Sequence, residues 1–99
     1  MTGTTQTNLP PSPDQLSIAR LVPKGSRVLD LGCGNGALLD YLIRERGCSG
    51  YGVEIDDANV QACVARGVNV IQFNLEDGLA LFGDASFDVV LQIDTLQHL

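Results

Sequence analysis

The sequence predicts an α/β fold, in which a parallel sheet of about four strands is flanked by helices. Three observations predict it. Apolar stretches of strand length alternate with segments whose apolar residues have helical spacing. The links between these segments are short, which is typical of βαβ units with right-handed crossovers. The expected strands are apolar along almost their whole length, as in a parallel sheet that is covered on both faces.

The first half of the chain contains the opening elements of this pattern. Asp14 is a candidate N-cap for a first helix, and residues 23–26 turn the chain. A buried strand is expected at residues 27–31. It leads through a cluster of glycines into a second helix, which Gly47 ends.

The same order of strand and helix then repeats. Asp57 is expected to cap a helix that Gly67 ends. The remaining strands are expected at residues 50–55, 68–75 and 87–93, with a short helix at 77–82.

Composition limits the classes of function. The 99 residues suffice for one domain, with residues 1–13 as a flexible tail and residues 14–99 as the folded part. Twelve acidic and six basic side chains give a net charge of −6, which disfavours nucleic-acid binding. No apolar run approaches the roughly 20 residues of a membrane span, and residues 1–13 lack the pattern of a secretory signal. We therefore expect a cytoplasmic protein without a membrane segment.

The chain has three cysteines, Cys33, Cys48 and Cys63, and one histidine. Their spacing matches neither a metal-binding motif nor a disulfide scaffold. We expect three small, partly buried thiols and no bound metal.

The most informative segment is Asp30-Leu31-Gly32-Cys33-Gly34-Asn35-Gly36. It joins the carboxyl end of the first strand to a helix, which is where open α/β sheets bind nucleotide-type ligands. Glycines let the backbone turn tightly and approach a ligand closely. The helix N-terminus adds free N–H groups and partial positive charge. We therefore expect Gly32, Cys33, Gly34 and Gly36 to contact a ligand.

Two classes of ligand fit these glycines. Gly32, Gly34 and Ala37 also satisfy the G-x-G-x-x-G/A pattern of dinucleotide sites. Asp30 favours S-adenosyl-L-methionine (AdoMet) instead, because a carboxylate repels a pyrophosphate and attracts the ammonium group of AdoMet. A structural role for Asp30, bonded to N–H groups of the loop, is compatible with this binding.

Glu54 and Ile55 end the second strand and are candidate contacts for the nucleoside. A carboxylate at this place can accept hydrogen bonds from both vicinal hydroxyls of a ribose. Ile55 is expected to pack on the adenine ring. The alternative is a solvated glutamate before the capping pair Asp56 and Asp57.

Asn74 and Leu75 end the third strand and are candidate contacts for the adenine edge. The carbonyl oxygen of Asn74 can accept from the adenine amino group, and the N–H of Leu75 can reach a ring nitrogen. Asparagine is also common in ordinary turns, so this assignment has a structural alternative. We assign no catalytic residue, and we expect His98 to have no special role.

The segment of residues 25–36 resembles motif I of class I methyltransferases. Residues 50–56 and 59–68, together with 86–88 and 95–97, resemble the methionine biosynthesis protein MetW family. The resemblance implies a Rossmann-like AdoMet-dependent methyltransferase fold, a link to methionine biosynthesis and an association with homoserine O-acetyltransferase. It also implies AdoMet contacts at Asp30, Gly32, Gly34, Glu54 and Asn74. Relatives usually have aspartate where this chain has Asn74.

Three functions remain open at this point. The chain is expected to be the AdoMet-binding part of a methyltransferase whose methyl acceptor is unknown. Alternatively, it supports homoserine O-acetyltransferase without catalysis, or it belongs to a dinucleotide-dependent oxidoreductase. Because only six residues follow the fourth strand, we expect the C-terminal part of the sheet to be missing. An uncovered fourth strand would favour self-association and leave catalysis weak.

Overall fold

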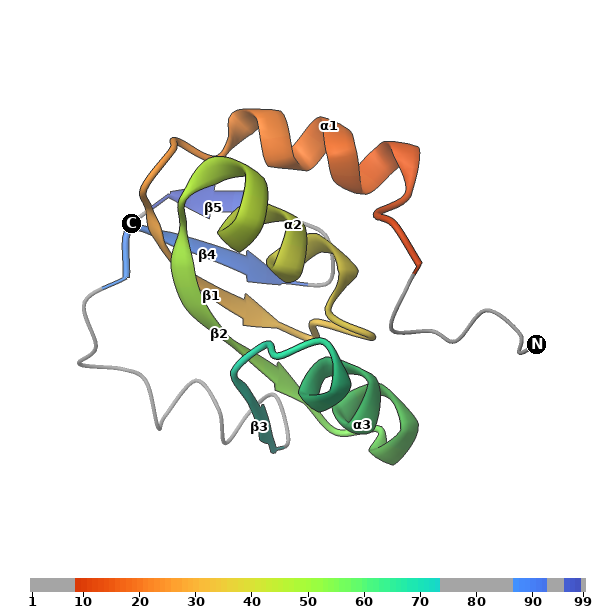
Figure 1. The fold of residues 1–99 in the computed structure, drawn as a ribbon. Helices are drawn as coiled ribbons and strands as arrows, with labels where there is room; N and C mark the ends of the chain where they lie inside the picture. Colours follow the sequence, from red (N-terminus) through yellow and green to blue (C-terminus); the bar gives the residue numbers. More distant parts are fainter. Residues whose placement is uncertain (1–8, 74–86, 93–95, 99) are drawn as a thin grey trace.

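A computed structural model describes residues 9–73, 87–92 and 96–98 of the chain (Figure 1). Eight elements lie in these ranges, and they alternate as the sequence predicts until the last two strands. In chain order they are α1 (Pro13–Leu21), β1 (Arg27–Leu31), α2 (Ala37–Arg46), β2 (Ser49–Glu54), α3 (Asp57–Ala65), β3 (Val70–Gln72), β4 (Val89–Gln92) and β5 (Leu96–His98).

The strands form one sheet with the order β3-β2-β1-β4-β5. β1 lies at its centre and pairs in parallel with both β2 and β4, while β3 pairs in parallel with β2. The predicted parallel sheet of four strands is therefore confirmed. The order reverses on the two sides of β1, so the loop after β1 lies at a topological switch point, where open α/β sheets bind ligands.

β5 corrects one expectation about the edge of this sheet. We expected the fourth strand to be uncovered, but β5 pairs with it antiparallel, with Val89 opposite His98 and Leu91 opposite Leu96. Because only residues 93–95 separate β4 from β5, the chain can fold back on itself, which antiparallel pairing requires. The unpaired backbone groups that suggested self-association are thus satisfied on β4.

The first helix begins earlier than the sequence suggested. Ser12 is its N-cap and not Asp14: the Ser12 hydroxyl accepts from the Gln15 N–H at 3.1 Å, and the Ser12 N–H donates to Oε1 of Gln15 at 2.9 Å. This reciprocal pair is a capping box, and Pro13 occupies the first turn, where its missing N–H costs nothing. In the same way Asp56, not Asp57, caps α3 by accepting from the Asn59 N–H.

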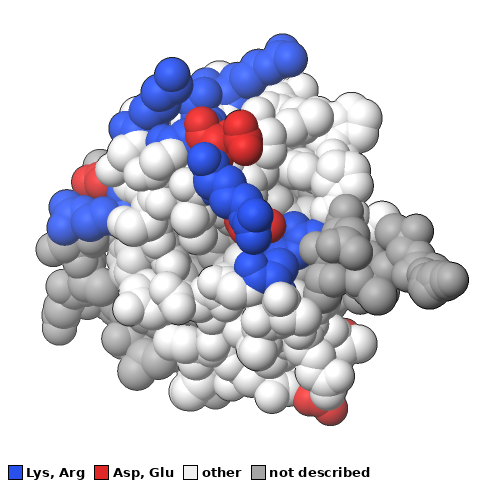
Figure 2. Space-filling model, in the orientation of Figure 1, with Lys and Arg blue, Asp and Glu red and all other residues white. Residues whose placement is uncertain are grey.

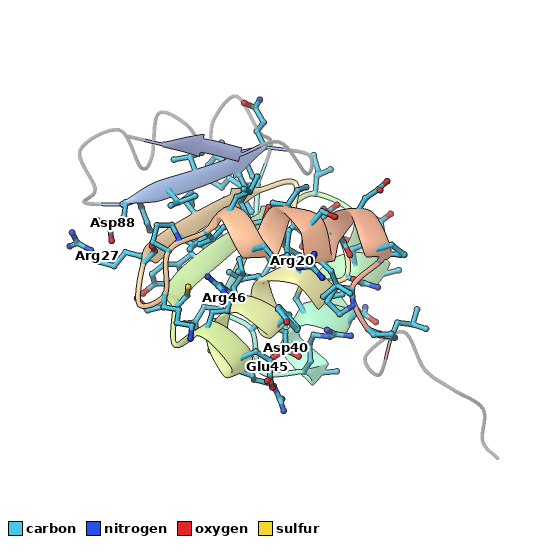
Figure 3. All side chains as sticks on the ribbon, turned by 90° about the horizontal axis from the view of Figure 1, so that it is seen from above. Arg20, Arg27, Asp40, Glu45, Arg46 and Asp88 are labelled. Atoms are coloured by element: carbon cyan, nitrogen blue, oxygen red, sulfur yellow. The ribbon has the colours of Figure 1, made fainter. Side chains whose placement is uncertain are left out.

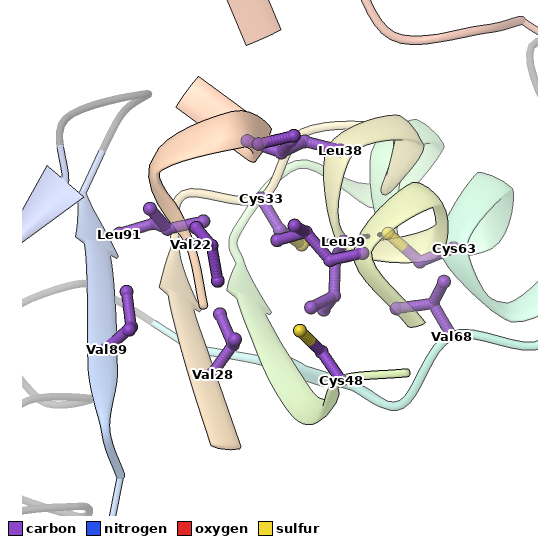
Figure 4. Packing of buried hydrophobic residues seen from close by; sticks show 12 residues of the cluster. Val22, Val28, Cys33, Leu38, Leu39, Cys48, Cys63, Val68, Val89 and Leu91 are labelled. Carbon is purple, nitrogen blue, oxygen red and sulfur yellow. Dashed lines mark hydrogen bonds between the residues drawn. The ribbon is translucent and has the colours of Figure 1, made fainter. Parts of the chain in front are cut away.

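The sheet has apolar residues on both faces, and adjacent residues of β1 divide between two clusters. Val28 belongs to the larger cluster, which includes Leu38, Leu39 and Leu42 of α2 (Figure 4). Leu29 belongs to a smaller cluster on the other face. Alternation with a period of two is what a strand covered on both faces requires.

Several expectations for the second half lie outside the described residues. β3 is shorter than the predicted strand at residues 68–75. Asn74, Leu75 and the helix expected at residues 77–82 fall in the range 74–86, which is not described. Within the described part of the chain, none of the helices has the length and apolar character needed to cross a membrane.

Candidate functional site

The loop between β1 and α2 is built from three glycines in the left-handed backbone region. Gly32, Gly34 and Gly36 have φ values of 79°, 59° and 84°. A residue with a Cβ is strained in this conformation, which explains the glycine spacing of the sequence motif. The loop therefore exposes its backbone at the carboxyl end of β1, where little side-chain bulk separates it from a ligand.

The loop is tied to β2. The N–H groups of Gly32 and Cys33 both donate to the carbonyl oxygen of Val53, at 2.7 and 3.1 Å. Farther along, the Gly36 N–H donates to the Cys33 carbonyl at 3.1 Å. These bonds make the loop a preformed turn, so less of its ordering cost falls on ligand binding.

Gly36 is the N-cap of α2, and a side chain does not fit there. A Cβ at this position would lie 2.9 Å from Sγ of Cys63 on α3. The Ala37 N–H is satisfied by Oδ1 of Asn35 at 3.0 Å. α3 thus packs directly against the start of α2, and the amino end of α2 faces the same region as the glycines.

Glu54 joins the loop to the end of β2. Its Oε1 accepts from the Gly34 N–H at 2.8 Å, and its Oε2 accepts from the Asp56 N–H at 3.0 Å. A carboxylate offers about four acceptor positions, so about two remain for further donors. The side chain is only partly buried and can therefore meet a ligand.

Ile55 follows Glu54 and is 62% exposed. An exposed large apolar side chain beside a half-buried carboxylate gives the site one apolar and one polar contact surface. A nucleoside has the same two parts, a flat ring and a hydroxylated sugar.

Asp30 lies in β1 directly before the loop and is only 3% exposed. Its Cα is paired with Gly52 of β2 and Leu91 of β4, so it lies in the middle of the sheet. The pKa of the neighbouring Cys33 thiol is raised chiefly by its interaction with Cys63 and by burial, and Asp30 adds to this rise, so its carboxyl group lies near the loop.

Polar residues stand at and after the end of the fourth strand. Gln92 ends β4 beside Leu31 of β1, at the carboxyl ends of the two parallel strands, which is also where the glycine loop begins. Asp94 and Thr95 lie outside the described residues. His98 pairs with Val89 at the amino end of β4. Its backbone therefore lies at the other end of the strands from the glycine loop, which follows the carboxyl end of β1.

The close approach of two cysteines was missed by sequence reasoning. Sγ of Cys33 and Sγ of Cys63 are 3.7 Å apart, and both thiols are buried. Their interaction raises the pKa of Cys33 and lowers that of Cys63, with burial adding to the rise and the nearby Arg66 contributing to the fall. The residues are 30 positions apart and form no motif, so only the packing of α3 on the loop brings them together.

Outside the loop, charged side chains gather on the helical face of the molecule (Figure 2). There Asp40 of α2 pairs with Arg44 at 2.7 Å and with Arg66 at 3.3 Å. A cavity of about 160 Å³ lies against these residues and against Leu9 and Pro10. Because Asp40 already has two cationic partners, we assign no ligand to this cavity. Among the described residues, no group of three His, Cys, Asp or Glu side chains could hold a metal ion.

Comparison with known proteins identifies the family. The model of the family described as methionine biosynthesis protein MetW matches residues 12–99. The chain belongs to the MetW family. A bifunctional methionine biosynthesis protein MetXA/MetW from Rhodopirellula baltica is 41% identical over 92 residues, which cover 85% of this chain and 15% of that protein.

Solved structures support the MetW assignment at the level of the fold. One is a SAM-dependent (AdoMet-dependent) methyltransferase from Thiobacillus denitrificans in complex with S-adenosyl-L-homocysteine, with a TM-score of 0.66 and 26% sequence identity. The match covers 83% of this chain and 36% of the Thiobacillus chain. A SAM-dependent methyltransferase from Archaeoglobus fulgidus has a TM-score of 0.62 and 34% sequence identity, and the match covers 78% of this chain and 37% of that one. The predicted Rossmann-like methyltransferase fold is confirmed. This MetW-family chain spans less than two fifths of the length of these relatives.

Proposed function

We propose that residues 14–99 form the AdoMet-binding part of a MetW-type methyltransferase-like protein that is linked to methionine biosynthesis, with residues 1–13 as a tail. The observation that carries this proposal is the contact between Glu54 and the glycine loop. It places a carboxylate with remaining acceptor capacity 2.8 Å from the N–H of Gly34. Binding groups for a hydroxylated sugar and for a backbone-contacting ligand thus lie side by side.

The described residues fit the parts of AdoMet separately. The glycine loop would leave room for the amino-acid portion, and the partial positive charge at the start of α2 would favour its carboxylate. The N–H groups of Gly32, Gly34 and Ala37 already have partners within the chain, so they would shape this space without donating to the ligand. Glu54 would accept from the ribose hydroxyls, and Ile55 would cover one face of the adenine. Asn74 and Leu75 remain our proposed contacts for the adenine edge.

AdoMet, when bound, supplies an electrophilic methyl group. The task of this chain would be to orient the molecule and exclude water around it, which can account for much of an enzyme's rate. Structural neighbours whose names include S-adenosyl-homocysteine support this ligand class. The methyl acceptor would meet the site beyond the ends of β1 and β4, where Gln92 lies.

Calorimetric titration of the full chain tests the ligand class. We expect binding of AdoMet and of S-adenosyl-homocysteine, with no binding of NAD at the same concentration. The reason is the carboxyl group of Asp30 next to the loop, which as a carboxylate would repel the negatively charged pyrophosphate of NAD. Binding of NAD without binding of AdoMet would replace this proposal by the dinucleotide alternative.

A second candidate function is a non-catalytic role beside homoserine O-acetyltransferase. The relative from Rhodopirellula baltica is named as one bifunctional protein, MetXA/MetW. This name supports a physical link between the two activities. Transfer of a labelled methyl group by a full-length relative, with and without the acetyltransferase, distinguishes the candidates. Transfer supports the enzyme, whereas a change only in acetyltransferase activity supports the partner role.

We also propose a cytoplasmic location. Its support is chemical: the three cysteines are free and buried, as is usual for proteins of a reducing compartment. Recovery of the protein from the periplasm or the medium, and not from the cytoplasmic fraction, would contradict this location.

A further inference from the structure

Cys33 and Cys63 form a pair of thiols directly beneath the glycine loop. Figure 4 shows the two sulfur atoms turned toward each other, one from the loop after β1 and the other from α3. They are 3.7 Å apart. Cys63 also donates to the carbonyl oxygen of Gly34 at 3.3 Å, so the pair touches the backbone of the proposed cofactor loop.

Two glycines confine this pair. A Cβ at Gly52 would lie 2.5 Å from Sγ of Cys33, and a Cβ at Gly36 would lie 2.9 Å from Sγ of Cys63. The sulfur atoms therefore fill spaces that only glycine leaves open, one on each side. A disulfide has a sulfur–sulfur distance of roughly 2.05 Å, so the two residues are about 1.7 Å from bonding distance.

The third cysteine has no such neighbour. Sγ of Cys48 is near the carbonyl oxygens of Pro23 and Arg46, at 3.8 and 3.9 Å. It is 5% exposed, which is close to the 6% of Cys33. Cys48 is therefore a matched control for the effect of having a thiol partner.

We propose that Cys33 and Cys63 are an oxidation site, at which a hydroperoxide forms an intramolecular disulfide between the loop and α3. One thiol loses its proton and, as thiolate, attacks an oxygen of hydrogen peroxide, so that the O–O bond breaks and a sulfenic acid forms. The departing hydroxide takes up the released proton and becomes the first water molecule. The second sulfur then attacks the first, and the S–OH bond breaks to release the second water. Two thiols and one hydrogen peroxide thus give one disulfide and two water molecules, and the sulfur atoms are oxidised.

The two thiols are suited to the two steps. The interaction with Cys33 and the nearby Arg66 lower the pKa of Cys63. Cys63 is therefore the sulfur that gives up its proton, and with it the contact to the Gly34 carbonyl, before it attacks the oxidant. Cys33 retains its proton until it resolves the sulfenic acid. Gly32 and Gly34, on either side of Cys33, are only partly buried, so little of the protein separates the pair from a small oxidant in solution.

The disulfide has a consequence for the loop that rests on the proposed function. Oxidation removes both S–H groups, so the Gly34 carbonyl loses its thiol donor while the loop is drawn toward α3. Gly34 is also the residue whose N–H holds Glu54. We expect the affinity for AdoMet to fall about tenfold, the equivalent of losing about one hydrogen bond.

The first experiment measures the disulfide itself in the full chain. After treatment with hydrogen peroxide and denaturation, tagging with a maleimide should count one free thiol, and peptide mapping should identify it as Cys48. Dithiothreitol should restore all three thiols. In Cys48→Ala the disulfide should still form, and in Cys63→Ala and the more conservative Cys63→Ser it should not. Three free thiols after treatment, or a disulfide that includes Cys48, would overturn the proposal.

The second experiment compares AdoMet titrations of the reduced and the oxidised chain. A tenfold loss that dithiothreitol reverses, and that Cys63→Ser does not show, supports control of the loop by the disulfide. Equal affinities would overturn that control. Absence of AdoMet binding to the reduced chain would refute the proposed function while the thiol count still decides the oxidation site.

Discussion

The N–H of Gly34 donates to Oε1 of Glu54 at 2.8 Å, across 20 positions of sequence. This bond joins the turn after β1 to the end of β2, and the second oxygen of Glu54 holds the N–H of Asp56 before α3. One carboxylate therefore organises both backbone segments that border the proposed nucleoside site. Its removal should affect the loop and the ligand together.

Replacing Glu54 should weaken AdoMet binding. A hydrogen bond to a charged group contributes about 1.5–3 kcal/mol, so Glu54→Ala is expected to lower affinity roughly 10- to 150-fold. Glu54→Gln keeps one acceptor oxygen and should lose less. Glu45→Gln, on an exposed glutamate of α2, is the control and should leave the affinity unchanged. Calorimetric titration gives all four dissociation constants, and equal values for Glu54→Ala and the unaltered chain would refute the role of Glu54.

Replacing Gly36 should destabilise the fold more than replacing Gly47. Both glycines have a positive φ. A Cβ at Gly36 would lie 2.9 Å from Sγ of Cys63, whereas a Cβ added at Gly47 would have no neighbouring atom within 4 Å. Gly47→Ala should cost about 1–2 kcal/mol for the conformation alone. Gly36→Ala should cost more, and urea unfolding measures the difference. Equal decreases in the free energy of unfolding would mean that α3 can move aside for the added methyl group without cost.

The core beneath α2 can be tested with two leucines of different exposure. Leu39 is fully buried against the sheet, and Leu21 of α1 is 62% exposed. Leu39→Ala should lower the free energy of unfolding by about 2–5 kcal/mol, because a cavity remains in the core. Leu21→Ala should change it by less than about 0.5 kcal/mol. Urea denaturation of both variants checks this, and comparable losses would contradict the packing described for α2.

Asp88 should contribute to stability in a pH-dependent way. Its carboxylate accepts from the Arg27 N–H at 2.8 Å and pairs with the Arg27 guanidinium at 3.4 Å (Figure 3), and the backbone bond is the larger cause of its lowered pKa. A folded-state pKa below the unfolded value of 3.8 gives a stabilisation that is present above that pH. The stabilisation is lost as the pH falls through the folded-state pKa.

Asp88→Asn should therefore lower the urea midpoint at about pH 7. The gap to the unaltered chain should close as the pH falls below 3.8 and through the folded-state pKa of Asp88. Glu45→Gln serves again as the exposed control and should show little gap at either pH. A gap for Asp88→Asn that persists unchanged at low pH would show that the charge of Asp88 does not stabilise the fold.

Local sequence signals predicted most elements but placed their ends less well. Ser12 and Asp14 can both cap a helix, and Asp56 and Asp57 are equally good candidates for α3. The deciding contacts are local, yet they depend on which backbone N–H each side chain reaches once the helix has formed. The Gln15 side chain, which completes the capping box with Ser12, was the signal that could have identified the first cap.

The candidate site was predicted in part. The motif from Asp30 to Gly36 identified the loop, and the structure confirms its position between β1 and α2. The motif did not show that Asp30 is buried in the sheet. Nor did it show that His98 lies at the far edge, because a pairing of β5 with β4 leaves no periodic pattern in so short a segment.

The amino-acid sequence alone determined the α/β class, the glycine turn and the MetW family, because each of these is written in neighbouring residues or in residue order. Only the tertiary structure decided that Glu54 holds Gly34, that Cys63 meets Cys33, and that β5 covers β4. Those contacts join residues that are far apart in sequence or whose pairing has no local signature. They depend on how the parallel crossovers and the final chain reversal bring the helices and strands together. This arrangement is set by the burial of apolar residues on both faces of the sheet.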